Sequence, residues 1–339
     1  MEANIQALTL QETPLERSTD FHPTTFEEYL GQASLKKKLS LYTQAAHLRN
    51  EPLDHLLLFG PPGLGKTTLA NIMAHTMDVG IKICNGPMLE RAGDLVAILS
   101  SLEPRDILFI DEIHRMPRAV EETLYSAMEH FRIDIIIGQG AGAKAVNLPI
   151  SQFTLVGATT QAGRISAPLR SRFGIVEQLQ FYMPEELTEI ILQNARFLEL
   201  KIDPASAARL AACSRGTPRI AKKLLRRIRD FAQVTNKNHA TKELVEEALE
   251  FLGIDQEGLT MLDRKIIQTI TEHFNGGPVG LDTIASLVGE DRQTLEDVYE
   301  PFLMRQGYLE RTPRGRQITR KKLAKLKTLA SGQKTVFKN

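Results

Sequence analysis

The sequence of 339 residues predicts an α/β domain with a parallel sheet and flanking helices, then a small all-α domain, then a C-terminal winged helix. Short apolar runs alternate with helical patterns in the first part of the chain, which is typical of a parallel sheet. Helical patterns alone follow, and the last part combines three helices with a basic hairpin. We expect the domain boundaries at 1–183, 184–256 and 257–330, with a disordered tail over 331–339.

The sheet is predicted from apolar runs bounded by glycine, proline or charged residues. Runs of this kind are too short for buried helices and are typical of strands covered on both faces. Helical spacing at Thr67–Met77 and Arg118–His130 predicts right-handed crossover helices between them. The runs are HLLLFG, VGIKIC, DILFID, FTLVGATT and VEQLQF.

Two groups of helices follow the sheet. Past Pro184 the strand pattern ends, and amphipathic segments predict a small bundle, with helices at Glu185–Leu200, Pro204–Cys213, Pro218–Thr235 and Thr241–Phe251. The next helices are expected at Met261–Phe274, Leu281–Val288 and Arg292–Gln306. After them, YLERTPRGRQIT contains two β-like runs around a Pro-Arg-Gly turn, which is typical of a winged helix.

Composition excludes several classes of protein. A hydrophobic share of 42% with 24% charged residues is that of a globular chain, so global disorder is excluded. No apolar stretch reaches the about 18 residues that a membrane span needs, and the polar N-terminus does not resemble a secretory signal. Cys84 and Cys213 lie among apolar residues, so we expect buried thiols in a reducing cytoplasm rather than a disulfide or a metal site.

The near-zero net charge conceals an uneven distribution. Residues 301–339 carry eleven Lys or Arg against one acid, Glu310, so this stretch is +10 and residues 1–300 are −9. A basic end on an otherwise acidic chain is typical of a nucleic-acid-binding module. A solvated basic helix remains the alternative at this point.

A glycine-rich loop follows the first strand. The segment 60–67 reads GPPGLGKT and fits the pattern G-x-x-x-x-G-K-[ST] between a strand and a helix. Its glycines let backbone N–H groups point at phosphate oxygens, and the helix N-terminus favours negative charge. Lys66 is expected to reach the β- and γ-phosphates and Thr67 to bind Mg²⁺. The sequence therefore predicts a nucleotide-phosphate site.

An acidic pair ends another strand. Asp111 follows the apolar run ILFI at the carboxyl end, where open α/β sheets bind ligands, and it can hold Mg²⁺. Glu112 is placed to orient and deprotonate the attacking water, which favours hydrolysis over nucleotide storage. His114 follows without a second ligand at a suitable spacing, so we expect a hydrogen-bonding or packing role for it rather than metal binding.

Two arginines stand near the ends of the α/β and helical patterns. Arg172 lies in LRSRF and Arg219 in GTPR. A guanidinium at the γ-phosphate can raise the rate of phosphoryl transfer by about 10³–10⁵-fold. Each alone is more typical of a surface arginine, and only the resemblance described below favours a role at the phosphate.

These motifs resemble the AAA+ P-loop ATPases, and in their order they resemble the RuvB family of bacterial Holliday-junction branch-migration motors. The resemblance covers about residues 20–328 and implies an ATP hydrolase coupled to DNA translocation, with ATP and Mg²⁺ as cofactors. The motifs are DEIHR (Asp111–Arg115), FTLVGATT (Phe153–Thr160), LRSRFG (Leu169–Gly174), RGTPRIA (Arg215–Ala221) and RTPRGR (Arg311–Arg316).

The resemblance implies roles for individual residues. Thr160 would sense the γ-phosphate, Arg172 would act in trans on the nucleotide of the neighbouring subunit, and Arg219 would contact phosphate in cis. Lys66, Asp111 and Glu112 complete the implied catalytic set. The implied nucleotide contacts also include Phe21, His22, Gly63, Gly65, Thr67, Thr68, Glu129, His130, Phe131 and Tyr182, with 129–131 at the subunit interface.

The resemblance also implies partners. Arg292, Arg311 and Arg316 match DNA-contacting positions, and arginines on a wing neutralise phosphates without reading bases. A finger that acts in trans requires a ring, so a homohexamer around double-stranded DNA is implied. The junction-binding protein RuvA would dock on a hairpin within 133–149, the resolvase RuvC would join them, and no membrane partner is expected.

Two alternatives remain open from the sequence. A clamp loader or replication-initiator ATPase has the same fold, but the GATT run, the RGTPRIA motif and the short one-wing head favour the motor. A DNA-binding regulator could use nucleotide only as a switch, but the position of Glu112 favours hydrolysis.

Overall fold

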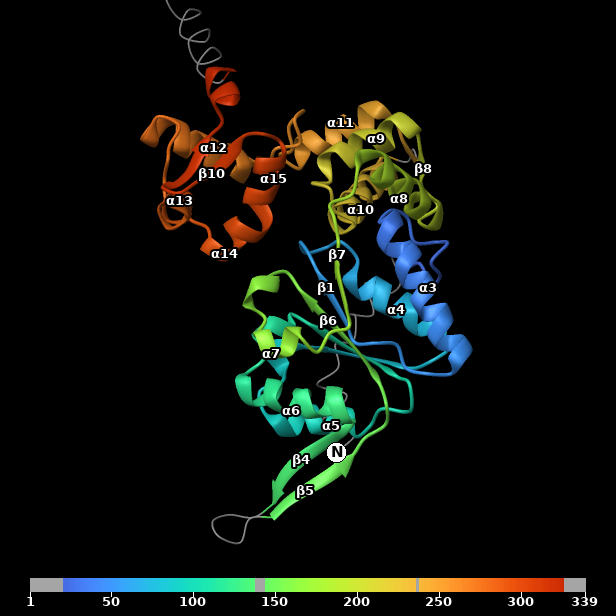
Figure 1. The fold of residues 1–339 in the computed structure, drawn as a ribbon. Helices are drawn as coiled ribbons and strands as arrows, with labels where there is room; N and C mark the ends of the chain where they lie inside the picture. Colours follow the sequence, from blue (N-terminus) through green and yellow to red (C-terminus); the bar gives the residue numbers. More distant parts are fainter. Residues whose placement is uncertain (1–20, 138–143, 236–237, 326–339) are drawn as a thin grey trace, which may run out of the picture. The chain divides into compact units, whose positions relative to one another are not determined.

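Five parallel strands form the central sheet in the order β2-β3-β6-β1-β7 (Figure 1). The computed structural model describes residues 21–137, 144–235 and 238–325. All five expected strands are confirmed, and they pair in parallel. The strands are β1 (Leu56–Phe59), β2 (Ile81–Asn85), β3 (Ile107–Asp111), β6 (Thr154–Thr159) and β7 (Ile175–Gln178).

The register of the sheet brings the candidate site together. Phe59 at the end of β1 pairs with Thr159 at the end of β6, and Asp111 at the end of β3 pairs with Asn85. Because the strands are parallel, their carboxyl ends meet at one edge of the sheet. The loops that follow β1, β3 and β6 therefore lie at the same edge.

Helices cover both faces of this sheet. Leu57, Leu108, Ile110 and Leu155 pack into one core with the apolar faces of α5 and α6. Along each strand, the residues that alternate with these point to the opposite face, where α3 and α4 lie (Figure 1). The helical elements here are α3 (Ala33–Arg49), α4 (Lys66–Met77), η1 (Gly86–Met88), α5 (Ala92–Leu99), η2 (Ile113–Arg115), α6 (Arg118–His130), η4 (Ala162–Arg164) and α7 (Ala167–Arg170).

A β-hairpin extends from the end of α6 (Figure 1). β4 (Arg132–Ile137) and β5 (Lys144–Pro149) pair antiparallel, as expected for the segment 133–149. Ile133 at its base is buried in the same core as α5 and α6, which anchors the hairpin to the α/β part. Residues 138–143 between the two strands lie outside the described residues.

The expected bundle contains α8 (Pro184–Phe197), α9 (Pro204–Cys213), α10 (Pro218–Val234) and α11 (Lys242–Phe251). Each of the first three begins with proline, whose fixed φ suits the first turn of a helix. We expected helices alone here, but β8 (Lys201–Ile202) and β9 (His239–Ala240) form a short parallel pair. Strands of two residues are too short to show an alternating pattern, so the sequence carries no signal for them.

The C-terminal part has the expected order of three helical stretches and a hairpin. They are α12 (Met261–Phe274), α13 (Leu281–Val288) and the continuous stretch α14 (Arg292–Thr294), η5 (Leu295–Tyr299) and α15 (Glu300–Arg305), then β10 (Leu309–Thr312) and β11 (Gly315–Ile318). The middle of the third stretch, η5, has wide π turns just before Pro301. Proline lacks an N–H group, and a π turn accommodates the missing helical hydrogen bond.

The chain divides into two compact units. The first unit comprises the chain up to Leu200 together with Gly216–Lys222, and the second comprises Lys201–Arg215 and the chain from Lys223 onward. The chain therefore changes unit after Leu200, again in the turn before α10, and a third time inside α10. The three expected domain ranges stay a prediction, and 331–339 lies outside the described residues.

Cys84 and Cys213 are free and buried, as expected. Burial raises the pKa of the Cys84 thiol to about 12, so it stays protonated. Among the described residues, no helix is both long and apolar enough to cross a membrane.

Candidate nucleotide and DNA sites

The phosphate loop connects β1 to α4 and depends on its glycines. Gly60, Gly63 and Gly65 have φ of 143°, 77° and 97°, a region that favours glycine because it lacks a Cβ. The Gly60 N–H donates to the Thr159 carbonyl at 3.1 Å, which fixes the loop to the end of β6. α4 begins at Lys66, so Thr67 and Thr68 lie in its first turn, where a helix attracts anions.

Lys66 folds back over the loop. Its ammonium donates to the Gly60 carbonyl at 2.9 Å and to the Pro61 carbonyl at 3.0 Å, and the residue is only 7% exposed. Burial lowers the pKa of this ammonium to about 8, while the charge of Asp111 acts to raise it and that of Arg219 to lower it. Phosphate oxygens would be better partners for the ammonium than these two carbonyls.

Arg219 lies against the phosphate loop. Its N–H donates to the Gly63 carbonyl at 3.4 Å, and a Cβ on Gly63 would come 2.9 Å from the Cβ of Arg219. Three residues earlier, the Gly216 carbonyl accepts from the Tyr182 N–H at 3.0 Å. These two backbone hydrogen bonds hold the start of α10 beside the phosphate loop. The Arg219 side chain, in the first turn of α10, is exposed.

The acidic pair stands at the end of β3, at the same edge. The Glu112 N–H donates to Asp111 Oδ1 at 2.9 Å, and both side chains are half-buried. Glu112 has φ of 47°, a left-handed conformation that is uncommon for residues with a side chain. Its carboxylate pairs with Arg115 at 2.8 Å. The proposed base is therefore held in an ion pair in this structure.

The end of β6 carries two threonines with different surroundings. Thr159 is buried, and its hydroxyl lies 2.9 Å from His114 Nδ1 and accepts from the Gln161 N–H at 2.9 Å. His114 thus has the hydrogen-bonding role that we expected. Thr160 follows directly after the strand and is half-buried at the edge of the sheet.

Two buried tyrosines hydrogen-bond to the phosphate loop. The Tyr182 hydroxyl donates to the Tyr29 hydroxyl at 2.8 Å, and Tyr29 in turn donates to the Leu64 carbonyl at 3.3 Å. Both tyrosines are buried, and Gly65 lies against the Tyr29 hydroxyl. Tyr182 was an expected nucleotide contact. Tyr29 could not be identified from the sequence, because its hydrogen-bond partners Leu64 and Tyr182 lie far along the chain.

The segment that begins at Phe21 is attached to the first unit. The Phe21 N–H donates to Asn194 Oδ1 at 3.2 Å, its ring meets that of Phe197 at 6.2 Å, and its carbonyl accepts from Lys222. His22, the next residue, is exposed.

Arg172 is held by contacts within this chain. Its guanidinium pairs with Glu129 at 3.1 Å, donates to the Pro168 carbonyl at 2.7 Å and stacks 4.5 Å from the centre of the Tyr125 ring. Its Nε is buried and has no hydrogen-bond partner. The structure thus brings Arg172 together with Glu129, and His130 and Phe131 follow at the end of α6.

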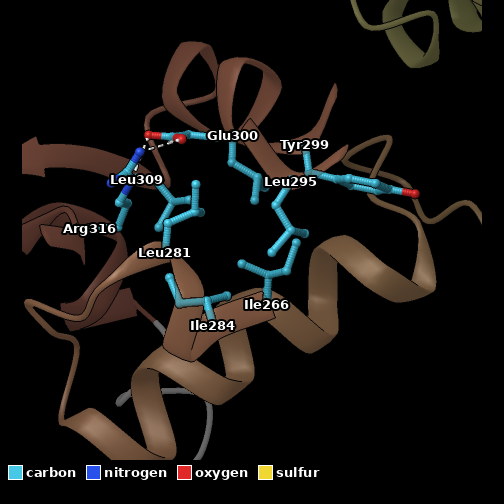
Figure 2. Close-up of a pocket in the computed structure, with 9 residues that line it drawn as sticks. Ile266, Leu281, Ile284, Leu295, Tyr299, Glu300, Leu309 and Arg316 are labelled. Atoms are coloured by element: carbon cyan, nitrogen blue, oxygen red, sulfur yellow. Dashed lines mark hydrogen bonds and ion pairs between the residues drawn. The ribbon is translucent and has the colours of Figure 1, made fainter. Parts of the chain in front are cut away.

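The three arginines expected to contact DNA all pair with carboxylates of the winged helix. Arg292 donates to both oxygens of Asp282 at 3.2 Å, and both side chains are exposed. Arg311 and Arg316 share Glu300, to which Arg316 donates twice at 3.1 Å. Figure 2 shows the ion pair between Glu300 and Arg316 at the margin of a group of apolar side chains.

Glu300 is the buried centre of this cluster. Its side chain is 2% exposed, against 19% for Arg316 and 52% for Arg311. Burial opposes ionisation of Glu300, but hydrogen bonds from Arg311 and Arg316 outweigh it and hold the pKa of the carboxyl below its ordinary value. Glu296 lies 3.9 Å from Arg311 and 3.8 Å from Arg316. Two carboxylates therefore offset the two arginine charges, which the sequence did not indicate.

Three family models match successive parts of the chain. The Holliday junction DNA helicase RuvB P-loop domain matches residues 21–179, the RuvB AAA lid domain 182–255, and the RuvB C-terminal winged helix domain 256–327. The chain belongs to the RuvB family. It is 54% identical to the Holliday junction branch migration complex subunit RuvB of Staphylococcus haemolyticus (strain JCSC1435). The match spans 314 residues and covers 93% of this chain and 94% of that protein.

Solved RuvB structures have the same fold. The Thermotoga maritima RuvB Holliday junction branch migration motor is 49% identical, with a TM-score of 0.81 over 90% of this chain and 98% of that one. A mutant of that protein is 50% identical, with a TM-score of 0.83 over 91% and 99% of the two chains. These matches confirm the expected family of ATP-driven branch-migration motors and the expected fold. They do not favour a clamp loader, a replication initiator or a nucleotide-switched regulator.

Proposed function

We propose that this chain is the ATP-hydrolysing subunit of a homohexameric ring that drives branch migration of Holliday junctions. The observation that carries the proposal is the meeting of the phosphate loop, the acidic pair and Thr160 at one edge of the sheet, in a chain with a RuvB-type winged helix. Recombination and repair of chromosomal DNA would then be its process, and the cytoplasm its compartment.

Nucleotide binding uses the backbone of the loop and the groups beside it. Lys66 would exchange the carbonyls of Gly60 and Pro61 for the β- and γ-phosphates, and Arg219 would contact phosphate in cis. Gly63, Gly65 and Thr68 would bind through the loop and the first turn of α4. Phe21, His22 and Tyr182 are proposed to contact the rest of the nucleotide.

The residues present suit Mg²⁺. Thr67 offers a hydroxyl and Asp111 a carboxylate, both hard oxygen donors, and Mg²⁺ in nucleotide sites takes one or two protein oxygens besides phosphates and water. These two residues would hold the ion, which when bound would neutralise charge on the phosphate oxygens. Among the described residues there is no cluster of three or more His, Cys, Asp or Glu, and a site completed by phosphates needs none.

Hydrolysis would use residues from two subunits. Glu112 would leave Arg115 and take a proton from the attacking water, while Thr160 senses the γ-phosphate. Arg172 would leave Glu129 and stabilise charge on the nucleotide of the neighbouring subunit, next to residues 129–131 at the interface. A contribution in trans requires a closed head-to-tail ring.

The remaining parts would bind the partners. Arg292, Arg311 and Arg316 would contact phosphates of double-stranded DNA and leave base sequence unread. RuvA would dock on the hairpin within 133–149, and RuvC would join the complex.

The test is strand exchange on a synthetic four-way junction with ATP and Mg²⁺, with and without RuvA. The wild-type chain should separate the junction, and Glu112→Gln should bind ATP normally while turnover falls by about 10²–10⁴-fold. Glu122→Gln, an exposed carboxylate on α6, is the matched control and should be active. Separation of a forked duplex but not of a junction would contradict the proposal.

A further inference from the structure

A buried arginine in the turn between α9 and α10 is bonded to the winged helix. Arg215 is 8% exposed, hydrogen-bonds Asp263 and donates to the Thr260 hydroxyl at 3.1 Å. Its guanidinium carbon lies 4.7 Å from the centre of the Phe302 ring and 5.1 Å from that of Tyr299. Arg215 therefore contacts both the start of α12 and the stretch from α14 to α15.

These contacts bind the turn firmly to the winged helix. Asp263 is fully buried, and the oxygen that meets Arg215 also accepts from the N–H and the hydroxyl of Thr260, at 2.7 and 2.6 Å. Removing one partner of a buried ion pair leaves an uncompensated charge, so such a pair resists opening. The two aromatic rings add cation–π attraction. Arg215 is thus held to the winged helix by an ion pair, a hydrogen bond and two ring contacts.

The other end of the same short segment, residues 216–219, is hydrogen-bonded beside the phosphate loop. Gly216 accepts from Tyr182, and the Arg219 N–H donates to Gly63. The change from the second compact unit to the first falls between Arg215 and Gly216. The four steps from Arg215 to Arg219 span at most about 14 Å when extended. No slack chain therefore lies between the residue beside the phosphates and the residue bonded to the winged helix.

The backbone at this point is held in an uncommon conformation. Arg215 and Gly216 both have positive φ, of 53° and 72°. A residue with a Cβ adopts this region only when its surroundings impose it. The side-chain contacts of Arg215 supply that constraint, which keeps the link short and stiff.

We propose that Arg215 is a positioning residue that transmits the movement of Arg219 to the DNA-binding head. When phosphate contacts at Arg219 change during the ATP cycle, the segment 215–219 shifts, and Arg215 carries Asp263 and the whole winged helix with it. This inference rests on the proposed contact of Arg219 with the nucleotide. Arg215 itself touches neither nucleotide nor DNA in this scheme.

The sharpest test lengthens the link without removing a contact. Two glycines inserted between Arg215 and Gly216 leave Arg215 at Asp263 and Arg219 at the loop. They make the 215–219 segment slack, while α10 stays a continuous helix. Arg215→Met removes the anchor itself. Arg209→Met is the matched control, since Arg209 is another partly buried arginine of α9, paired with Glu246 but outside the 215–219 segment. Melting temperatures check that each full-length variant folds.

Three quantities are measured on a four-way junction: ATPase rate without DNA, junction affinity with ADP and with a non-hydrolysable ATP analogue, and base pairs migrated per ATP. The insertion should change the basal ATPase rate by no more than about twofold, but lower the migration per ATP by about fivefold or more. It should also remove any difference in junction affinity between the two nucleotides. Arg215→Met should share this loss, while Arg209→Met should keep wild-type coupling.

Specific outcomes would overturn the proposal. An insertion variant with normal migration per ATP would do so, even if Arg215→Met were unstable, because Arg215 would then be merely structural. A loss of junction affinity that is equal in both nucleotide states, without loss of coupling, would have the same meaning. Unchanged ATP affinity in Arg219→Ala would instead remove the proposed nucleotide contact, and the present inference with it.

Discussion

The nucleotide site and the DNA-binding head hold their cationic side chains in different ways. Lys66, proposed to act on a ligand of its own subunit, donates to backbone carbonyls of the phosphate loop. Arg311 and Arg316, proposed to act on DNA, share the carboxylate of Glu300. Arg172, proposed to act on the next subunit, behaves like the arginines of the head, because it pairs with Glu129.

This difference follows from where the ligand lies. A site that encloses its ligand can leave the cation on neutral carbonyls, which phosphate displaces without separating an ion pair. An arginine proposed to act outside its own subunit has no enclosed ligand in the free chain, and a nearby carboxylate holds its rotamer and offsets its charge. For the head this means moderate attraction to phosphates, which suits DNA that must slide past.

The largest expected effect tests Arg172, which is proposed to act on the nucleotide of the neighbouring subunit. Arg172→Ala should lower ATP turnover by about 10³-fold or more, because charge on the transferring phosphoryl loses its guanidinium. Activity should return when this variant is mixed with a subunit that lacks Lys66 function but keeps Arg172. The ATPase rate across mixing ratios is the measurement. Arg170→Ala, an exposed neighbour, is the control; failure of every mixture to recover would speak against a shared site.

The buried ammonium of Lys66 should make ATP binding depend on pH. Because the pKa of Lys66 is about 8 in the free chain and bound phosphates would raise it, ATP binding takes up a proton above pH 8. Affinity should be nearly constant below pH 7 and fall by about fivefold between pH 8 and 9. Calorimetry in buffers of different ionisation enthalpy measures the uptake. In Lys66→Arg, which stays charged, the pH dependence should vanish; its persistence would assign the proton elsewhere.

Removing the offsetting carboxylate should strengthen the head. Glu300→Gln raises the local charge by one while retaining an acceptor for Arg316, so DNA should bind severalfold tighter, with a salt slope steeper by about one. Binding is measured by anisotropy on duplexes of unrelated sequence over a range of salt concentrations. Glu310→Gln, on the exposed face of β10, is the control for a general charge effect. Weaker binding in Glu300→Gln would mean that positioning of the arginines outweighs the offset.

The smallest expected effect comes from one arginine of the pair. Arg311→Ala should weaken binding to all DNA sequences alike and reduce the salt slope by about one. Arg264→Ala, an arginine of α12 paired with Asp255 away from the wing, should leave the slope unchanged. A loss limited to one sequence would indicate base reading instead.

Local patterns were sufficient to predict the fold. The central strands β1, β3 and β6 are largely apolar runs, whereas the edge strands β2 (IKICN) and β7 (IVEQ) also contain polar residues. The helices from Pro204–Cys213 to Leu281–Val288 show clear start signals and periodicity. The segment 60–67 was recognisable because its chemistry depends on residues adjacent in the chain. The pairing of β8 with β9 was not, because two residues carry no period.

Tertiary partners explain what the sequence could not indicate. Tyr29 and Tyr182 are far apart in the chain, so neither suggests a hydroxyl relay beneath the loop. Nothing in the pattern of α15 marks Glu300 as buried beneath two arginines of the wing. Arg215 belongs to a recognised motif, yet its partner Asp263 lies 48 residues further along the chain.

The chain passes between its two compact units three times, and this limits how the protein can be divided into fragments. The unit with the phosphate loop is assembled from the chain up to Leu200 and a separate piece, Gly216–Lys222. A fragment cut after Leu200 would lack the piece with Arg219, and one extended through Lys222 must also carry α9. A contiguous fragment that contains the complete nucleotide site must therefore extend through α9 to at least Lys222.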